Sequence, residues 1–210
     1  MDIFSQYRDL VDSLIVAAKK MYDFRYEMSD GGNLSIRIPE KNWMIVKGTN
    51  IAFDEVDVTT LVVTDFNGNV VEGCVKPSKE SLLHGVLYAA LPQVHAIMHC
   101  HSPYATAWAA DHDTLEFSTH HARYKLGFCP VLDTHSYVVP QESFPEIINL
   151  FHAHENMRAF ILRGHGQVTV GKSMRDAAYL TELVEETAQI STLSHVIKGV
   201  REKPLMGQVM

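Results

Sequence analysis

Apolar residues recur along almost the whole chain with the spacing of either helices or strands. Apolar side chains three or four positions apart predict helices over 3–22, 77–91, 102–111, 144–156 and 173–198. Shorter apolar runs, some strictly alternating, predict strands within 34–38, 43–47, 61–73, 95–101, 114–133 and 157–171. The segment 114–133 is predicted as two short strands, on which the adjacent His120 and His121 face opposite sides.

The order of these elements favours an α/β fold. Helices alternate with strands, as in proteins that cover a sheet with helices. The segments 61–73 and 157–171 each hold two strands around a Gly-containing turn, and strands joined in this way run antiparallel. We therefore predict a sheet that is not purely parallel, with helices on both faces. No linker, repeat or low-complexity tract interrupts the sequence, so we predict a single domain over 1–210.

Two histidines end the predicted strand 95–101. Residues i and i+2 of a strand point to the same face, so the imidazoles of His99 and His101 project together. Two nitrogen donors on one face suit a divalent metal such as zinc. His152 and His154 have the same spacing but lie in a predicted helix, where residues i and i+2 are about 200° apart. We expect no metal at this second pair.

His165 is the candidate third ligand. It lies in the turn of 157–171 between two glycines, which allow the backbone to approach another segment closely. Three histidines with an open fourth position are typical of a catalytic zinc site. The alternative interpretation is an ordinary histidine in a turn.

Glu80 lies in the first turn of the predicted helix 77–91, for which Ser78 is the predicted N-cap. The free N–H groups of such a turn can bind an anion such as phosphate, and Lys79 adds positive charge. A carboxylate beside a metal and an anion is a candidate general acid/base, although Glu80 could instead only complement the helix dipole. His84, one turn further on, is either a partner of Glu80 or a buried neighbour.

Polar turns elsewhere in the sequence have the composition of anion-binding loops. Asn33 in GGNLS and Thr49 in KGTN combine glycine with side-chain donors. Each is a weak signal alone, since loops are rich in these residues. Together with PSKE they indicate a phosphorylated or carboxylated substrate.

The charge and composition exclude several kinds of partner. The chain has 18 Lys+Arg against 25 Asp+Glu, a net charge of −7, and no basic run, so we expect no nucleic-acid partner. No stretch approaches the ~20 apolar residues of a membrane span, and the N-terminal segment is too acidic for a signal peptide. Cys74, Cys100 and Cys129 form no paired motif, so we interpret them as reduced thiols of a cytoplasmic protein.

Taken in order, these motifs resemble the class II aldolase/adducin family over most of the chain. The order is GGNLS, KGTN, PSKE with a helical histidine, HCHSPYATA, GHG and a long closing helix. The resemblance implies three α/β/α layers around a mostly antiparallel central sheet. It also implies a homotetramer with active sites between subunits.

The resemblance further implies roles for individual residues. The family's zinc ligands match His99, His101 and His165. Its phosphate-binding positions match Asn33, Thr49 and Ser78. Glu80 matches the acid that moves protons, and Lys79 can reach a phosphate or a substrate carboxylate. The implied cofactor is Zn²⁺ or another divalent metal, and the implied substrate is a small phosphorylated sugar or sugar acid.

Some residues depart from the family pattern. Asn50 stands where the aldolases usually have glycine, and Lys79 stands where they often have a second serine, as in a variant associated with the decarboxylases. The epimerases carry Asp at the position of Glu80. The tyrosine that several aldolases supply is missing, and Tyr137 and His135 are the candidates to replace it.

We therefore predict a zinc-dependent lyase. It would cleave or form a small phosphorylated ketose through a metal-stabilised enediolate, with Glu80 moving the proton. The alternative is a decarboxylase or dehydratase of a sugar phosphate or sugar-acid phosphate on the same scaffold. A 4-epimerase, or a non-catalytic binding domain like the adducin head, agrees less well with Glu80 and the three histidines.

Overall fold

One sheet forms the centre of the computed structural model, which describes residues 2–202. Its strands are β1 (Asn33–Arg37), β2 (Trp43–Lys47), β3 (Leu61–Asp65), β4 (Val70–Glu72), β5 (Ala96–Cys100), β6 (Val131–Leu132), β7 (Ala159–Leu162) and β8 (Gly166–Gly171). They lie in the order β4-β3-β2-β1-β5-β8-β7-β6, and every neighbouring pair is antiparallel except β6 and β7. The prediction of a mostly antiparallel sheet is confirmed.

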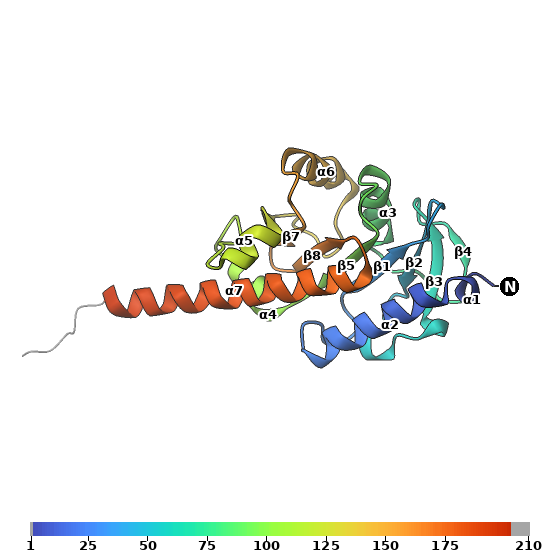
Figure 1. Ribbon diagram of the computed structural model, residues 1–210, viewed down its shortest axis with the longest axis horizontal. Coiled ribbons are helices and arrows are strands. Elements are labelled where there is room, and N and C mark those ends of the chain that lie inside the picture. The colour runs from blue at the N-terminus through green and yellow to red at the C-terminus, as the bar shows by residue number, and fades with distance from the viewer. Residues whose placement is uncertain (1, 203–210) are drawn as a thin grey trace, which may run out of the picture.

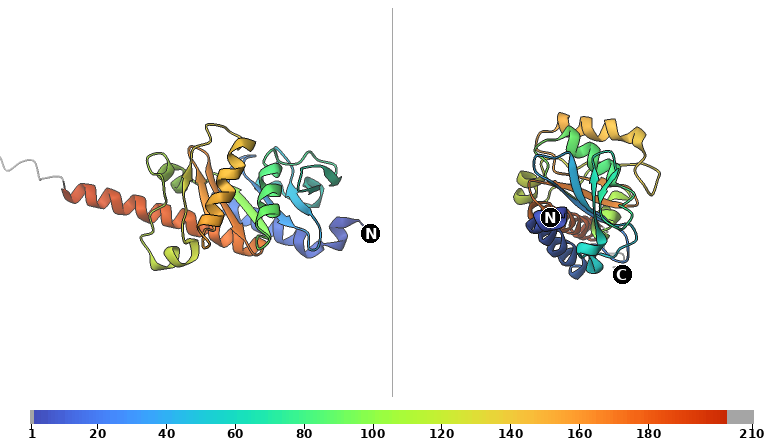
Figure 2. Two further views of the ribbon diagram at one scale, coloured as in Figure 1. Left: turned by 90° about the horizontal axis from the view of Figure 1, so that it is seen from above. Right: turned by 90° about the vertical axis from the view of Figure 1, so that its right-hand side faces the viewer.

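Helices cover both faces of this sheet, as the alternation of elements predicts (Figures 1 and 2). They are α1 (Ile3–Gln6), α2 (Arg8–Asp23), α3 (Ser81–Ala90), α4 (Pro103–Ala109), α5 (His120–Leu126), α6 (Phe144–Ala153) and α7 (Met174–Glu202). Helices α2 and α7 pack on one face and α3 and α6 on the other, which gives three layers. Within residues 2–202, no helix combines the length and the apolar character that crossing a membrane requires.

The alternation of side chains along β5 decides which face receives the histidines. Met98 and Cys100 pack in the apolar cluster under α2 and α7, whereas Ile97 packs in the cluster under α3 and α6. His99 follows Ile97 by two residues and therefore points to the α3 side of the sheet. The site accordingly begins beneath α3, where β5 ends.

The prediction of two strands in 114–133 is wrong for its central part. His120–Leu126 forms helix α5, because the Thr119 side chain accepts the Ala122 N–H at 3.1 Å and caps its start. Ala122 and Leu126, one turn apart, are buried in a cluster that includes residues of α7. His120 and His121 are therefore neighbours on a helix, not on a strand.

The prediction that Ser78 is the N-cap of the following helix is also wrong. Helix α3 begins at Ser81, and Glu80 is its N-cap residue. Ser78 is held in extended pairing with the end of β2, since its N–H donates to the Lys47 carbonyl at 3.1 Å. Pro77 forms a bridge with Gly48 in the same pairing. The chain becomes helical only after this pairing ends.

Candidate active site

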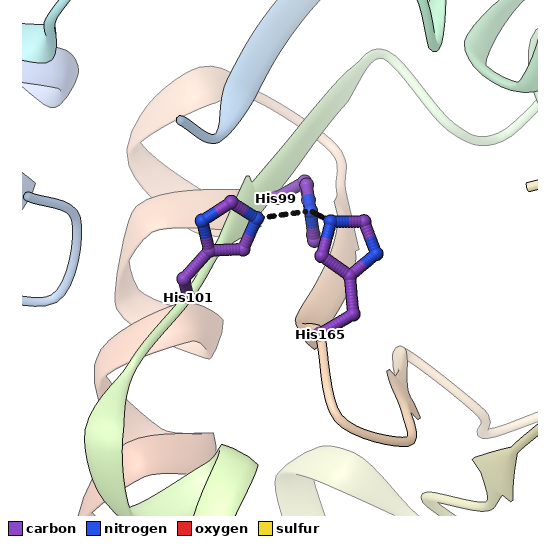
Figure 3. A group of neighbouring side chains, drawn as sticks. All are labelled: His99, His101 and His165. Carbon is purple, nitrogen blue, oxygen red and sulfur yellow. Dashed lines mark hydrogen bonds between the residues drawn. The ribbon is translucent and has the colours of Figure 1, made fainter. Parts of the chain in front are cut away.

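Three imidazole rings meet at one point on the sheet, His99 and His101 at the end of β5 and His165 in the turn before β8 (Figure 3). The Nε2 atoms of His99 and His101 are 3.1 Å apart, and those of His99 and His165 are 3.3 Å apart. One ligand atom from each of the three histidines lies within 4.8 Å of the others. The structure therefore brings the three predicted ligands together.

The pairing of β5 with β8 creates this convergence. His99 lies opposite Val168 in the register of the two strands, so the turn that carries His165 folds over the end of β5. A Cβ atom on Gly166 would be only 2.2 Å from the Cys100 carbonyl oxygen. Only glycine permits this close approach, which explains the glycine that follows His165 in the sequence.

The protonation of His99 and His165 suits metal binding. Burial lowers the pKa of His99 well below its usual range and lowers that of His165 to about 4. Both rings are therefore neutral at pH 7. The Nδ1 atom of His99 lies 2.9 Å from the Gln167 carbonyl, to which it must donate, so its Nε2 carries a lone pair toward the other rings. A set of neutral imidazole nitrogens fits zinc or a similar divalent metal.

Glu80 lies in the same pocket, and one of its carboxylate oxygens accepts a backbone hydrogen bond. Its Oε1 accepts the Val139 N–H at 2.9 Å. Its Oε2 is buried and has no hydrogen-bond partner among the described residues. Burial raises the pKa of Glu80, and the Val139 hydrogen bond opposes that effect. A carboxylate with a raised pKa and a free oxygen is suited to accepting and returning a proton.

The pocket also contains every predicted anion-binding residue. Its wall includes Asn33, Thr49, Ser78 and Lys79, together with Glu80 and the three histidines. Asn33 lies directly opposite His99 in the pairing of β1 with β5. The loop of Thr49 and the loop of Ser78 are joined by backbone hydrogen bonds. The Thr49 N–H donates to the Lys76 carbonyl at 2.9 Å, next to the hydrogen bond from the Ser78 N–H to the Lys47 carbonyl. Loops far apart in sequence thus form one polar rim.

Lys47 is a pocket residue that the sequence analysis missed. It ends β2, is 1% exposed, and its Nζ donates to the Ile51 carbonyl. Burial lowers its pKa to about 8, although the nearby charge of Glu27 opposes this. Its position directly before the Gly-Thr-Asn turn is the one signal that could have suggested it.

The structure separates the two candidates for the missing tyrosine. Tyr137 lines the pocket, with its ring centroid 5.5 Å from that of His165 and 5.6 Å from the Lys79 Nζ. His135 instead contacts Asp133, and its side chain is 85% exposed. Tyr137 is thus the member of the pair that lies at the site.

His84 proves to be a buried neighbour of the site and makes no hydrogen bond to the Glu80 side chain. Its Nδ1 lies 2.7 Å from the Ser35 hydroxyl, which is also 2.8 Å from the Tyr88 hydroxyl. Burial lowers the pKa of His84 to about 3, so the ring is neutral. The side chains of His84, Ser35 and Tyr88 thus form a buried polar cluster between α3 and the sheet.

Most of the chain also matches the sequence pattern of a known protein family. The family model for the class II aldolase and adducin N-terminal domain matches residues 12–192. The chain belongs to the class II aldolase and adducin family. The matched interval includes strand β5 and the turn before β8, which position the histidines, and helix α3 with Glu80 before it.

Members of the family that resemble this chain have different names. An L-fuculose phosphate aldolase of Methanococcus maripaludis is 30% identical over 184 residues, which cover 88% of this chain and 97% of that protein. A 3-oxo-tetronate 4-phosphate decarboxylase of Haemophilus influenzae is 31% identical over 183 residues, covering 84% of each. The solved structure of an L-fuculose 1-phosphate aldolase matches with a TM-score of 0.81 and 28% identity, covering 94% of this chain and 89% of that one. The family therefore includes relatives named for different reactions on phosphorylated compounds.

Proposed function

We propose that the protein is a metal-dependent lyase that cleaves or forms a small phosphorylated ketose by an aldol reaction. The observation that carries the proposal is the meeting of three imidazoles with a Glu80 carboxylate, one oxygen of which has no hydrogen-bond partner among the described residues, in one pocket. The name of the Methanococcus maripaludis relative supports the same reaction class. The proposed cofactor is Zn²⁺ or another divalent metal.

Each part of the pocket has a task in this reaction. A divalent metal held by the three histidines would supply a Lewis acid for the carbonyl and hydroxyl oxygens of the substrate. Glu80 Oε2 would accept and return the proton at the carbon beside the carbonyl. The rim around Thr49, Ser78 and Lys79 would hold the anionic end of the substrate and so fix its reacting carbon.

Tyr137 is the proposed acid/base within this chain at the hydroxyl that becomes the aldehyde oxygen. It would accept the proton of that hydroxyl in cleavage and donate it to the aldehyde oxygen in condensation. Its ring lies beside His165 and near the Lys79 ammonium. This assignment deepens the expectation from sequence, in which Tyr137 was one of two candidates.

A decarboxylase or dehydratase of a sugar-acid phosphate is the second candidate function. The observation that favours it is Lys79, an exposed cation on the pocket wall that can bind a substrate carboxylate as well as a phosphate. The Haemophilus influenzae relative carries the name of such a decarboxylase. Both reactions need an activated carbonyl, so the histidines serve either one.

Product analysis distinguishes these functions. Purified protein loaded with Zn²⁺ is incubated with ketose 1-phosphates and, separately, with 3-oxo sugar-acid phosphates. We expect an aldehyde and dihydroxyacetone phosphate from at least one ketose phosphate, and no release of carbon dioxide. Release of carbon dioxide from the sugar acids without any aldehyde product would assign the decarboxylase instead.

Lys47 lines the pocket with Thr49 and Ser78, so we also assign its ammonium to the anion site. Replacing Lys47 by methionine is expected to raise KM for a phosphorylated substrate by about 10- to 100-fold, the value of one hydrogen bond to a charged group. Since the free-enzyme pKa of Lys47 is lowered to about 8, kcat/KM of the wild type should fall as pH rises through that value. The variant should lack this decline. Steady-state kinetics from pH 6 to 10 measure both effects.

The matched control is Lys41→Met, because Lys41 is exposed in the turn between β1 and β2 and lies over the Trp43 ring. This variant should keep the wild-type KM and pH profile. An unchanged KM in Lys47→Met would remove Lys47 from the anion site.

We also propose a homotetramer with active sites at the subunit boundaries. Helix α7 extends past the rest of the molecule at its C-terminal end (Figure 1). That end exposes an apolar stripe with helical spacing, formed by Leu193, Val196, Ile197 and Val200. A stripe of this kind is suited to packing against another copy of the chain.

A further inference from the structure

A second buried carboxylate lies behind the histidines. Glu27 lies in the loop between α2 and β1 and is 1% exposed. Its Oε2 accepts the backbone N–H of His101 at 2.7 Å, a contact between residues 74 positions apart. Its Oε1 has no hydrogen-bond partner among the described residues and lies 3.3 Å from the Nδ1 atom of His101. One carboxylate therefore contacts both the backbone and the ring of a proposed metal ligand.

The surrounding loop is built around this carboxylate. A Cβ on Gly31 would lie 2.6 Å from His101 Nδ1 and 2.8 Å from Glu27 Oε1. A Cβ on Gly32 would lie 2.5 Å from Glu27 Oε2, and Gly32 has a φ of 55°. Any side chain at either position would push the carboxylate away from the ring. The two glycines thus keep the contact between Glu27 and His101 direct.

The chemistry of imidazole gives this contact a consequence. A neutral histidine has one N–H and one lone pair, and the hydrogen bond at one nitrogen decides which nitrogen holds the proton. The Nε2 atom of His101 faces the Nε2 atom of His99. A carboxylate that accepts the Nδ1 proton leaves the Nε2 lone pair free for a metal and fixes the plane of the ring.

We propose that Glu27 is a positioning residue for the metal centre, holding His101 in the Nδ1–H tautomer with its Nε2 directed at the ion. His99 receives the equivalent support from the Gln167 carbonyl. Glu27 touches neither substrate nor reacting atoms, so its effect passes through His101. This inference rests on the metal site of the proposed function.

Glu27→Gln is the variant that isolates this role. If the amide oxygen keeps the bond to the His101 backbone N–H, the amide NH₂ faces Nδ1 and moves the ring proton to Nε2. If the amide is turned around, its NH₂ faces the backbone N–H and that bond is lost. Size and burial are preserved in both cases. The first arrangement removes the acceptor at Nδ1, and the second keeps a neutral acceptor there only by placing two donors, the amide NH₂ and the His101 backbone N–H, against each other.

The matched control is Glu185→Gln. Glu185 is also a buried glutamate, 4% exposed, whose oxygens accept the N–H groups of Tyr104 and Ala105 at 2.9 and 2.8 Å. It contacts none of the three histidines through these bonds. Both variants disturb a buried carboxylate bonded to the backbone, but only Glu27→Gln disturbs a ring nitrogen of a ligand.

The test measures Zn²⁺ affinity by competition with a chromophoric chelator, and the visible absorption spectrum of the Co²⁺-loaded protein. We expect Glu27→Gln to bind Zn²⁺ about 10- to 100-fold more weakly than wild type, which is the usual loss when the hydrogen-bond partner of a metal-binding histidine is replaced. The visible absorption bands of its Co²⁺ form should also change. Glu185→Gln should bind as wild type does. Circular dichroism in the presence of a chelator establishes that each variant is folded.

Each outcome either supports or overturns the positioning role of Glu27. Wild-type affinity in folded Glu27→Gln, or an equal loss in Glu185→Gln, would overturn the positioning role while leaving the metal site in place. A wild-type protein that binds neither Zn²⁺ nor Co²⁺ would overturn the metal site itself. If Glu27→Gln does not fold, Glu27→Asp replaces it, and the proposal then requires weaker Zn²⁺ binding in that folded variant.

Discussion

Replacing Glu80 by glutamine is expected to lower kcat by about 10²- to 10⁴-fold, the usual contribution of a general acid/base. The glutamine side chain can still accept the Val139 N–H, so the loop that carries Tyr137 should stay in place. Because burial disfavours the charged form of Glu80, the variant should be at least as stable as the wild type. Metal-saturated kinetics and thermal unfolding measure the two effects separately.

The control for this prediction is Glu142→Gln. Glu142 is exposed and lies on the wall of the neighbouring groove, outside the pocket that holds the histidines. Its replacement should leave kcat unchanged. A kcat in Glu80→Gln within a few-fold of the wild type would exclude Glu80 as the group that moves the proton.

Replacing His165 by alanine is expected to abolish measurable turnover and to weaken Zn²⁺ binding by more than about a hundredfold. Loss of a partner behind a ligating histidine already costs about 10- to 100-fold in affinity, and loss of the ligand itself should exceed this. The ring lies in a turn and is partly exposed, so the fold should be retained. Metal content after dialysis and the rise of Tm with added Zn²⁺ are the measurements.

His152→Ala is the appropriate comparison for His165→Ala. His152 is exposed in the last turn of α6, and it is two positions from His154, the same spacing as between His99 and His101. This variant should keep its metal and its activity. If His165→Ala retained one tightly bound Zn²⁺ per chain, the proposed ligand set would be incorrect.

Most of the fold could be predicted from the sequence because its elements have strong, local periodicity. Strand β5, whose five residues are all buried, and the hairpin of β7 and β8 follow directly from the apolar run and the turn composition. The errors occur where a side chain or a distant strand decides the structure. Thr119 caps a helix in a segment rich in residues typical of strands, and the backbone of Ser78 is taken by β2 before it can begin a helix.

The candidate site likewise contains residues that the sequence indicates and residues that it does not. His99 and His101 lie two positions apart at the end of one strand, so their common direction could be deduced from spacing alone. Glu27 and Lys47 could not be found by that reasoning, because each acquires its place only when the chain folds. Glu27 meets a residue 74 positions away, and the burial of Lys47 depends on the turn that folds over it toward Ile51 and Phe53.

The position of the histidines in the middle of the sheet separates two parts of the protein that can change independently during evolution. Strands β1, β5 and β8 are central and buried, so substitutions there would disturb the whole sheet. Tyr137 and Lys79 lie instead on connecting segments at the rim, outside every strand. Under the proposed function, changes at the rim would alter which phosphorylated compound is accepted, while the central strands would keep the three histidines together.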